Sequence, residues 1–322
     1  MDSEINIKQP AHVSVLLNES INGLGIEPNG VYIDGTFGRG GHSKKILEKL
    51  SANGRLIAID RDPSAIKYAR ENIKDVRFEI EQGDFSNLKS FVHGRELTGK
   101  IDGILLDLGV SSPQLDNADR GFSFSKDGPL DMRMNSTSGM TLREWLSVAS
   151  IEEIFYVLKN YGEEKFAYRI AKAIVAYRES DDTPELKNTL QLAQIIESAT
   201  PKKDKNKHPA TRSFQGFRIY INNELEEIKS VLNDSIDVLK KGGRLSVISF
   251  HSLEDRIVKQ FIREKSKRKS LPKGLPLTDD EVNAMTSKPL LKALSKAIKP
   301  SDEEIKSNVR SRSSILRIAE KL

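Results

Sequence analysis

The residues best suited to chemistry begin with the stretch DGTFGRGGHS, residues 34–43, which follows a short apolar run. Glycine lets the backbone approach a ligand closely, and a helix N-terminus favours negative or electron-rich groups. The dinucleotide fingerprint G-x-G-x-x-G needs a third glycine at position 43, where Ser43 stands, so that match fails. What remains is Asp34 followed by glycines, which is the pattern of a nucleoside-binding loop.

Two further positions extend this pattern toward a nucleoside cofactor. Asp60, in AIDRDP, ends an apolar run, where an acid can accept hydrogen bonds from both ribose hydroxyls. Phe85, in GDF, could flank an adenine ring. The sequence contains no G-x-x-x-x-G-K-[ST] loop, so S-adenosylmethionine fits better than ATP or NAD. Taken singly, Asp60 is explained as well by a helix cap, Phe85 by a core side chain and the glycines by a turn. Their occurrence together, in this order along the chain, favours a cofactor site.

The stretch DLGVSSPQ, residues 107–114, could activate a methyl acceptor. An exocyclic amino group of a base is a poor nucleophile because its lone pair is delocalised into the ring. Hydrogen-bond acceptors aimed at its hydrogens localise that lone pair, and positioning in line with a sulfonium does much of the rest. The candidate catalytic residues are Asp107, Ser111, Ser112 and Pro113, the proline by fixing the backbone direction. On local sequence alone a β-turn is the preferred explanation.

Composition narrows the chemistry further. The chain has no cysteine, which excludes disulfides, thiolate zinc sites and the covalent cysteine route to cytosine C5 methylation. Lysine and arginine (51) outnumber aspartate and glutamate (46), and the net charge of +5 permits a polyanionic partner without requiring one. No apolar run approaches the roughly 20 residues of a membrane span, and the N-terminus lacks an apolar signal segment, so a cytoplasmic protein without membrane contact is expected.

Alternating apolar runs and helical patterns in the first hundred residues predict βα units around a parallel sheet. Strands are expected over residues 31–34, 55–60, 76–80 and 103–108, with helices over 44–50 and 63–73. From residue 115 the apolar spacing becomes three and four, which predicts helices over 151–160, 163–179 and 190–199. The pattern ends with one long helix over 217–243, a strand over 244–250, and an antiparallel edge pair over 289–295 and 313–320.

This change of periodicity predicts the domain organisation. Residues 1–114 form the first part of an α/β domain, 115–212 a helical insertion for substrate recognition, and 213–322 the second part of the α/β domain.

The motifs above, with HVSVLLNES, YGEEKFAYRIAKAIV, FRIYINNELEEI, RLSVISFHSLEDR and RSRSSILRIAEK, resemble in order the bacterial 16S rRNA (cytosine-N4) methyltransferase family, the RsmH or MraW family. The block from DLGVSSPQ to DMRM, residues 107–134, is highly specific. The resemblance implies a Rossmann-like class I S-adenosylmethionine-dependent methyltransferase with an inserted all-helical domain. It implies methylation of the N4 amino group of a decoding-site cytidine in 16S rRNA of the small ribosomal subunit, and a homodimer as a family-based expectation. The alternative is a non-catalytic RNA-binding assembly factor that keeps a nucleoside pocket.

The family's cofactor contacts, carried over by position, are Gly40, Gly41, His42, Asp60, Phe85, Asp107 and Gln114. Two departures from the family pattern are Ser14, where proline is usual, and Gly216 with Phe217, where alanine and leucine are usual. Neither departure is expected to touch the cofactor loop.

RNA contacts are expected in three places. Amino-methyltransferases of DNA commonly carry Pro-Pro-aromatic where this chain has SSPQ, which lacks the aromatic residue. The ring that stacks on the cytosine is therefore expected elsewhere, at Phe122 or Phe124. A hydrophobic anchor for the loop explains both rings equally well. A target cytidine would be splayed out of its stack. Basic side chains are expected to make salt-dependent contacts with phosphate. They are Arg120, Arg133, Arg310, Arg312, Arg212, Lys202, Lys203, Lys205 and Lys207. For each lysine the alternative is a solvated run of surface charge.

A metal-ligand set is the alternative explanation for His251, Glu254 and Asp255 in FHSLEDR. A helix cap by Ser252, with Asp255 three residues later, explains the pattern at least as well. We therefore expect no catalytic metal.

Overall fold

The computed structural model describes residues 14–201, 208–267 and 288–322 and divides into two compact units. Unit 1 comprises Met1–Asp60, Ser64–Leu108 and Ile228–Leu322, and unit 2 comprises Arg61–Pro63 and Gly109–Glu227. Unit 2 therefore extends beyond the helical insertion expected over 115–212 at both ends. No helix within the described ranges is both long and apolar enough to cross a bilayer.

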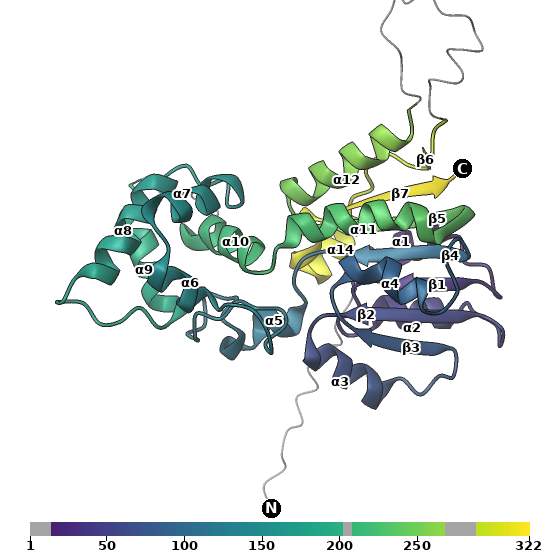
Figure 1. Cartoon of the computed structure of the whole chain (residues 1–322), viewed down its shortest axis with the longest axis horizontal. Coiled ribbons are helices and arrows are strands. Elements are labelled where there is room, and N and C mark those ends of the chain that lie inside the picture. The colour runs from purple at the N-terminus through teal and green to yellow at the C-terminus, as the bar shows by residue number, and fades with distance from the viewer. Residues whose placement is uncertain (1–13, 202–207, 268–287) are drawn as a thin grey trace, which may run out of the picture. The chain divides into compact units, whose positions relative to one another are not determined.

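Unit 1 is built on a seven-stranded sheet whose order is β3-β2-β1-β4-β5-β7-β6, running from bottom to top in Figure 1. The first five strands in this order are parallel, and β7 pairs antiparallel with both β5 and β6. The Rossmann-like α/β architecture and the antiparallel edge pair are confirmed. The strands span β1 Val31–Asp34, β2 Arg55–Asp60, β3 Phe78–Gln82, β4 Ile101–Asp107, β5 Leu239–Ser249, β6 Leu291–Ala293 and β7 Ile315–Lys321.

The strand order reverses between β1 and β4, and this reversal locates the ligand edge. β1 pairs with β2 on one side and with β4 on the other, and the chain reaches these neighbours by crossovers in opposite directions. In open parallel sheets, ligands bind outside the carboxyl ends of the strands at such a switch point. β4 is buried along most of its length, as expected for a central strand of a parallel sheet.

Helices pack on the sheet through their apolar faces. In α1 and α2, Ile21, Leu24, Ile46 and Leu47 join one core cluster with residues of β1, β2 and β4. The elements that lie largely in unit 1 are α1 Leu17–Leu24, α2 Gly41–Leu47, α3 Pro63–Asn72, η1 Phe85–Asn87, α4 Leu88–His93, α11 Glu224–Val238, α12 Ser252–Lys265, α14 Asp302–Ser307 and η3 Val309–Ser313.

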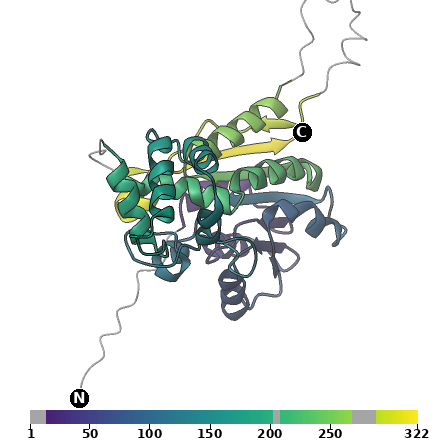
Figure 2. The ribbon, with the colours of Figure 1, turned by 60° about the vertical axis from the view of Figure 1, so that its left-hand side comes forward.

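Unit 2 is helical, as Figure 2 shows from a second side, and its helices share a buried hydrophobic core. Trp145, Ile170 and Phe217 belong to one buried cluster that draws on most of the helices. Gly216 allows α10 to approach Gly162 closely, because a Cβ there would lie 2.8 Å from the Gly162 nitrogen. The elements are α5 Ser112–Asp116, η2 Ala118–Arg120, α6 Leu142–Val148, α7 Ile151–Asn160, α8 Ala167–Glu179, α9 Thr189–Ala199 and α10 Ala210–Ile221.

The prediction of one long helix over 217–243 is wrong. The chain breaks between α10 and α11, where Asn223 adopts the left-handed conformation (φ 51°), which asparagine tolerates better than most residues. The buried Asn222 amide accepts a hydrogen bond from the Met134 nitrogen and donates one to the Met132 carbonyl, at 2.7 and 2.8 Å. The Gly-Gly pair then lies inside β5 and does not terminate a helix.

Replacing Asn222 by alanine should destabilise unit 2. The change leaves a buried N–H and a buried carbonyl without partners, and each such group costs ~1–3 kcal/mol. Trp145, the only tryptophan in the chain, lies in the core of unit 2 and reports its unfolding by fluorescence in urea. Asn160→Ala is the matched control, because that amide bonds one exposed carbonyl on α7. Equal urea midpoints for the two variants would contradict the role given to Asn222.

Candidate active site

Three acids stand at the carboxyl ends of parallel strands in unit 1. Asp34 ends β1, Asp60 ends β2 and Asp107 ends β4. Because these strands run in parallel, the three carboxyl groups lie along one edge of the sheet. This is the edge that the strand order marks for a ligand.

The glycine loop holds the Asp60 carboxylate in place. The Gly38 N–H donates to Oδ2 of Asp60 at 2.7 Å, which fixes the carboxyl group at the strand end. Gly41 begins α2, and a Cβ there would lie 1.9 Å from Oγ of Ser14, so no larger residue fits. The expectation that Ser14 stays clear of the cofactor loop is therefore wrong, because the hydroxyl packs directly against Gly41.

Asp34 accepts hydrogen bonds from the loop that follows its own strand. It is fully buried, and its carboxylate accepts hydrogen bonds from the Ser43 hydroxyl at 2.6 Å and the Thr36 nitrogen at 3.2 Å. Burial raises the pKa of Asp34 to about 6, and the two hydrogen bonds oppose that rise. Asp34 thus ties the start of α2 to the end of β1.

Asp107 has a different environment, since its two carboxyl oxygens are not equivalent. Oδ2 lies 3.6 Å from Nδ1 of His42, whereas Oδ1 is buried and has no hydrogen-bond partner among the described residues. The backbone N–H of Asp107 donates to the Thr36 hydroxyl at 2.6 Å. Burial first, and then the charges of Asp34 and Glu254, raise the pKa of Asp107 well above its usual range.

Phe85 lies beside the loop that follows β1. It begins the short helix η1 and is partly buried. A Cβ placed on Gly35 would lie 3.8 Å from the Cβ of Phe85, so Phe85 lies next to this loop. Its place beside an adenine stays a prediction.

The remaining residues of DLGVSSPQ belong to unit 2, where they form a capped helix. Ser111 precedes α5 and forms a capping box with Gln114, whose Oε1 accepts from the Ser111 nitrogen at 2.9 Å. Pro113 occupies the first turn, where a missing N–H has no cost. Ser112 begins the helix and is partly buried. The Gln114 amide nitrogen donates to Asp62 at 2.9 Å, so both ends of this buried side chain are bonded within unit 2.

Arg120 and Arg133 support the loop they bracket. The Arg120 guanidinium donates to Asp62 at 2.7 Å and to the carbonyls of Arg133 and Met134 at 3.0 and 2.7 Å. Arg133 donates to both oxygens of Asp131 at 2.8 Å. Because these donors are bound internally, the geometry gives no support to the expected phosphate contacts.

The two candidate stacking rings also differ. Phe122 is buried in the core of unit 2, which matches the alternative of a loop anchor. Phe124 is partly buried and stacks on the His208 ring at 4.6 Å between centroids, and it makes a T-shaped contact with Phe214. Neither ring is presented as a free platform.

Other predicted RNA contacts lie elsewhere. Arg310 and Arg312 are exposed on η3 in unit 1, and Arg212 is partly buried on α10 in unit 2. The expected contacts at Lys202, Lys203, Lys205 and Lys207 lie outside the described residues.

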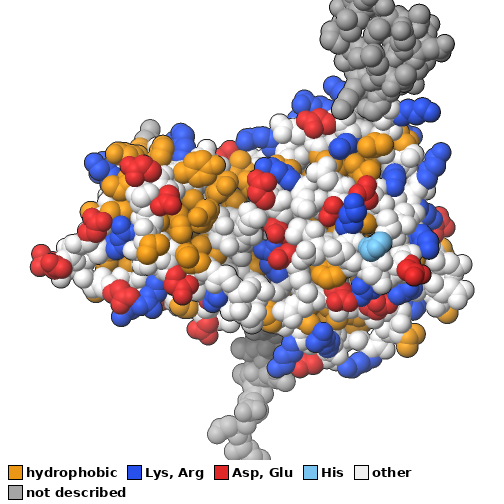
Figure 3. Space-filling view, in the orientation of Figure 1, with side chains coloured by type: hydrophobic (Ala, Val, Ile, Leu, Met, Phe, Trp, Pro, Cys, Tyr) orange, Lys and Arg blue, Asp and Glu red, His pale blue; other side chains and the backbone are white. Residues whose placement is uncertain are grey.

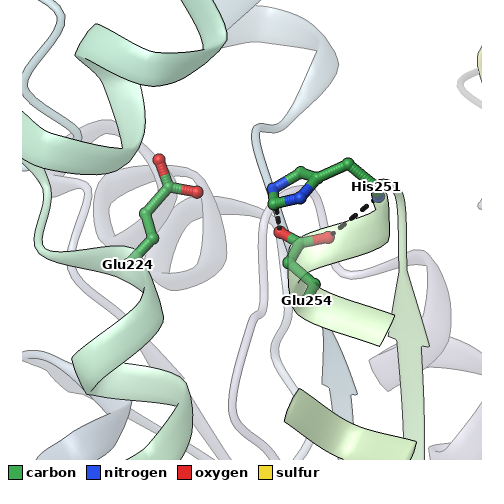
Figure 4. A group of neighbouring side chains, drawn as sticks. All are labelled: Glu224, His251 and Glu254. Atoms are coloured by element: carbon green, nitrogen blue, oxygen red, sulfur yellow. Dashed lines mark hydrogen bonds and ion pairs between the residues drawn. The ribbon is translucent and has the colours of Figure 1, made fainter. Parts of the chain in front are cut away.

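The cap predicted at Ser252 is wrong by one residue. His251 is the cap of α12, and Glu254 accepts from the Phe250 and His251 nitrogens at 2.7 and 3.3 Å. Figure 4 shows the two contacts between His251 and Glu254. Nε2 of His251 lies 3.1 Å from Oε1 of the buried Glu254. Asp255 pairs instead with Arg317 on β7, at 2.7 and 3.0 Å. Local sequence could not separate the two caps, because both fit the same spacing.

Comparison with known protein families gives a match over nearly the whole chain. The model of the family described as "MraW methylase family" matches residues 9–322. Similar solved structures include a candidate rRNA-methylase from Clostridium thermocellum, at 10% identity and TM-score 0.44, covering 97% of this chain and 100% of that chain. Another is an rRNA methylase from Streptococcus thermophilus, at 12% identity and TM-score 0.43, covering 97% of this chain and 99% of that chain. These structural likenesses are distant.

The raised pKa of Asp34 predicts a pH-dependent stability. Between its ordinary pKa of 3.8 and its folded pKa of about 6, the folded protein binds more protons than the unfolded chain. The stability that Asp34 contributes is therefore complete below about pH 4 and is lost as the pH rises through 6, by about 3 kcal/mol in all.

Urea unfolding of the wild type and of Asp34→Asn, followed by circular dichroism from pH 4 to 7, measures this effect. The wild-type free energy of unfolding should fall relative to the variant across this range. Parallel pH curves would refute a buried, proton-binding Asp34.

Proposed function

The chain belongs to the MraW methylase family, and we propose that it transfers a methyl group to the N4 amino group of a decoding-site cytidine in 16S rRNA of the small ribosomal subunit. Its methyl donor is S-adenosylmethionine, and unit 1 has the fold of the class I methyltransferases that use this donor. The observation that carries the amino-group proposal is Oδ1 of Asp107 at the carboxyl end of β4, which is buried and has no hydrogen-bond partner in the described part of the chain.

The residues at the sheet edge fit S-adenosylmethionine. In this proposal the Asp60 carboxylate, which accepts a hydrogen bond from the Gly38 N–H, binds the ribose hydroxyls, and Phe85 at the start of η1 flanks the adenine. Gly40 and Gly41 let the backbone approach the ligand. When bound, the cofactor supplies an electrophilic methyl group on a sulfonium.

Asp107 is suited to an amino acceptor. A buried oxygen without a partner carries an energetic penalty of ~1–3 kcal/mol, which a donor from a ligand removes. An exocyclic amino group supplies such a donor, and an acceptor at its hydrogen localises the nitrogen lone pair for attack. The raised pKa of Asp107 makes its ionised form a stronger base for the proton released after methylation.

Unit 2 has surface properties that suit unpaired RNA. Figure 3 shows apolar side chains gathered on one of its faces, and its exposed aromatic residues include Tyr156, Tyr168 and Tyr220, at 54%, 52% and 39% exposure. The Lys172 ammonium lies 5.5 Å from the centre of the Tyr168 ring. Aromatic rings next to cations bind unpaired bases by stacking while the cation meets phosphate. A non-catalytic RNA-binding factor would share this surface but form no product.

Small ribosomal subunits that lack the modification should yield N4-methylcytidine when incubated with this protein and isotope-labelled S-adenosylmethionine. Nucleoside mass analysis identifies the product, and sequencing of the labelled fragment gives its place in 16S rRNA. Asp107→Ala should lose activity by at least about 100-fold, in line with the removal of a general base. Methyl transfer to another atom, or none with the wild type, would defeat the proposal; normal turnover by the variant would remove Asp107 from the mechanism.

Asp60→Ala should weaken cofactor binding by about 10-fold to 100-fold, since hydrogen bonds to a charged group contribute about 1.5–3 kcal/mol. Calorimetry with S-adenosylmethionine measures the dissociation constant directly. Asp237→Ala is the matched control in unit 1, because that carboxylate pairs with Lys89 on the surface. An unchanged constant in Asp60→Ala would refute the ribose contact.

A further inference from the structure

Unit 2 contains a cavity between α8 and α9. Its volume is about 490 Å³, within the range of roughly 300–1,000 Å³ that is typical of small-ligand pockets. On α8, the lining residues Arg169, Ala173 and Tyr177 are spaced by four and therefore share one face of the helix. On α9, Ile195 and Ala199 have the same spacing. The short side chains of the two alanines leave space between these faces that larger side chains would fill.

Four polar side chains of this lining are available to a ligand. Within the part of the chain that the structure describes, none of the four makes a hydrogen bond or an ion pair; they are Arg169, Tyr177, Gln194 and Ser198. Gln191 differs, because its Oε1 accepts from the Lys187 and Asn188 nitrogens at 2.9 and 3.1 Å. Among the described lining residues, Arg169 is the one that carries a charge. The cavity therefore offers a ligand one cation, no anion, and neutral donors and acceptors.

This combination of groups suits a nucleotide. A guanidinium pairs with phosphate through two parallel N–H···O bonds. The Gln194 amide both donates and accepts, which matches the edge of a nucleobase. Ile195 and the Tyr177 ring offer contact to the face of a base. A base inside a duplex has both faces covered by its neighbours, so the cavity suits an unpaired base.

The aromatic surface of unit 2 lies next to this cavity. The Lys172 ammonium lies 5.5 Å from the centre of the Tyr168 ring, and Lys172 follows Arg169 by three residues on α8. Residues three apart are neighbours on a helix surface, and both cations are exposed. A single strand that stacks on Tyr168 therefore meets a second cation at the cavity.

We propose that the cavity between α8 and α9 binds one unpaired nucleotide of the RNA substrate, with its phosphate on Arg169 and the edge of its base on Gln194. The inference rests on the proposed function, which makes RNA the substrate. The nucleotide is not the target cytidine, because the described lining has no acid to accept a proton from an amino group. This second contact adds affinity and selects an unpaired strand without taking part in methyl transfer.

Equilibrium binding of a fluorescein-labelled single-stranded RNA to the full chain, without S-adenosylmethionine, tests the contacts. Arg169→Gln should weaken binding by about 10-fold at low salt, since a charged hydrogen bond to phosphate is lost. It should also reduce the slope of log K against log salt by about 0.7, the value for one phosphate of a single strand. Gln194→Ala should weaken binding by about 5-fold with an unchanged slope, because the lost hydrogen bond joins neutral groups.

The matched control is Arg143→Gln, because Arg143 on α6 is paired with Glu185. It removes the same charge from unit 2 but should change neither the affinity nor the slope. Trp145 fluorescence in urea checks that unit 2 remains folded in each variant. Equal losses in Arg169→Gln and Arg143→Gln, or an unchanged affinity in Gln194→Ala, would indicate only a diffuse attraction between charges and would overturn the proposal.

A cross-link locates the bound nucleotide. Single-stranded RNA that contains 4-thiouridine, irradiated with the full chain and digested, should leave RNA on peptides from residues 169–177 or 191–199. An excess of uridine 5′-monophosphate should reduce this cross-link, because it offers the same phosphate and base. No cross-link in these two segments, or tight binding of the free mononucleotide without an RNA cross-link, would overturn the assignment to RNA. Since neither experiment involves methyl transfer, a positive result stands even if N4-methylcytidine is not the product.

Discussion

The parallel pairing of β1 with β4 is the constraint on which the candidate active site depends. The register aligns Asp34 with Leu105, and the Gly35 nitrogen extends the ladder by donating to the Leu105 carbonyl at 2.9 Å. The two strands are far apart in sequence, yet their pairing brings the loop after β1 next to the end of β4. Without this register, Asp107 would have no imidazole opposite its carboxyl group.

Acids at the buried edge of a sheet need compensation, and one segment donates hydrogen bonds to two of them and places an imidazole beside the third. Gly38 donates to Asp60, Ser43 donates to Asp34, and His42 faces Asp107. Burial of a carboxylate without hydrogen bonds or an opposite charge is strongly unfavourable. The segment 38–43 is therefore as much an electrostatic support for the edge as a ligand loop, which explains why its glycines and polar side chains alternate so closely.

Much of this edge could be predicted from the sequence, because it depends on local patterns. Apolar runs ending in Asp34, Asp60 and Asp107 mark strand ends, and strands 31–34 and 55–60 appear at the expected residues. The wrong predictions concern features that depend on contacts with residues far away in the sequence. The break at Asn222 depends on carbonyl and amide groups near residue 133, about ninety residues away, and no local propensity contains that information.

The same distinction changes the interpretation of DLGVSSPQ. Asp107 ends a strand of unit 1, whereas Ser111 to Gln114 form the capped start of the short helix α5, which Asp62 and Arg120 help to hold within unit 2. The predicted β-turn is in fact the capped start of the short helix α5, and the chemical explanation stays a proposal for Asp107. The capping box uses the Ser111 amide and the Gln114 carbonyl oxygen, while Oδ1 of Asp107 is the buried acceptor without a described partner. Since a group already bonded to its own backbone gains little from a new donor and an unsatisfied one gains much, Asp107 is the residue of this stretch best suited to face the amino group.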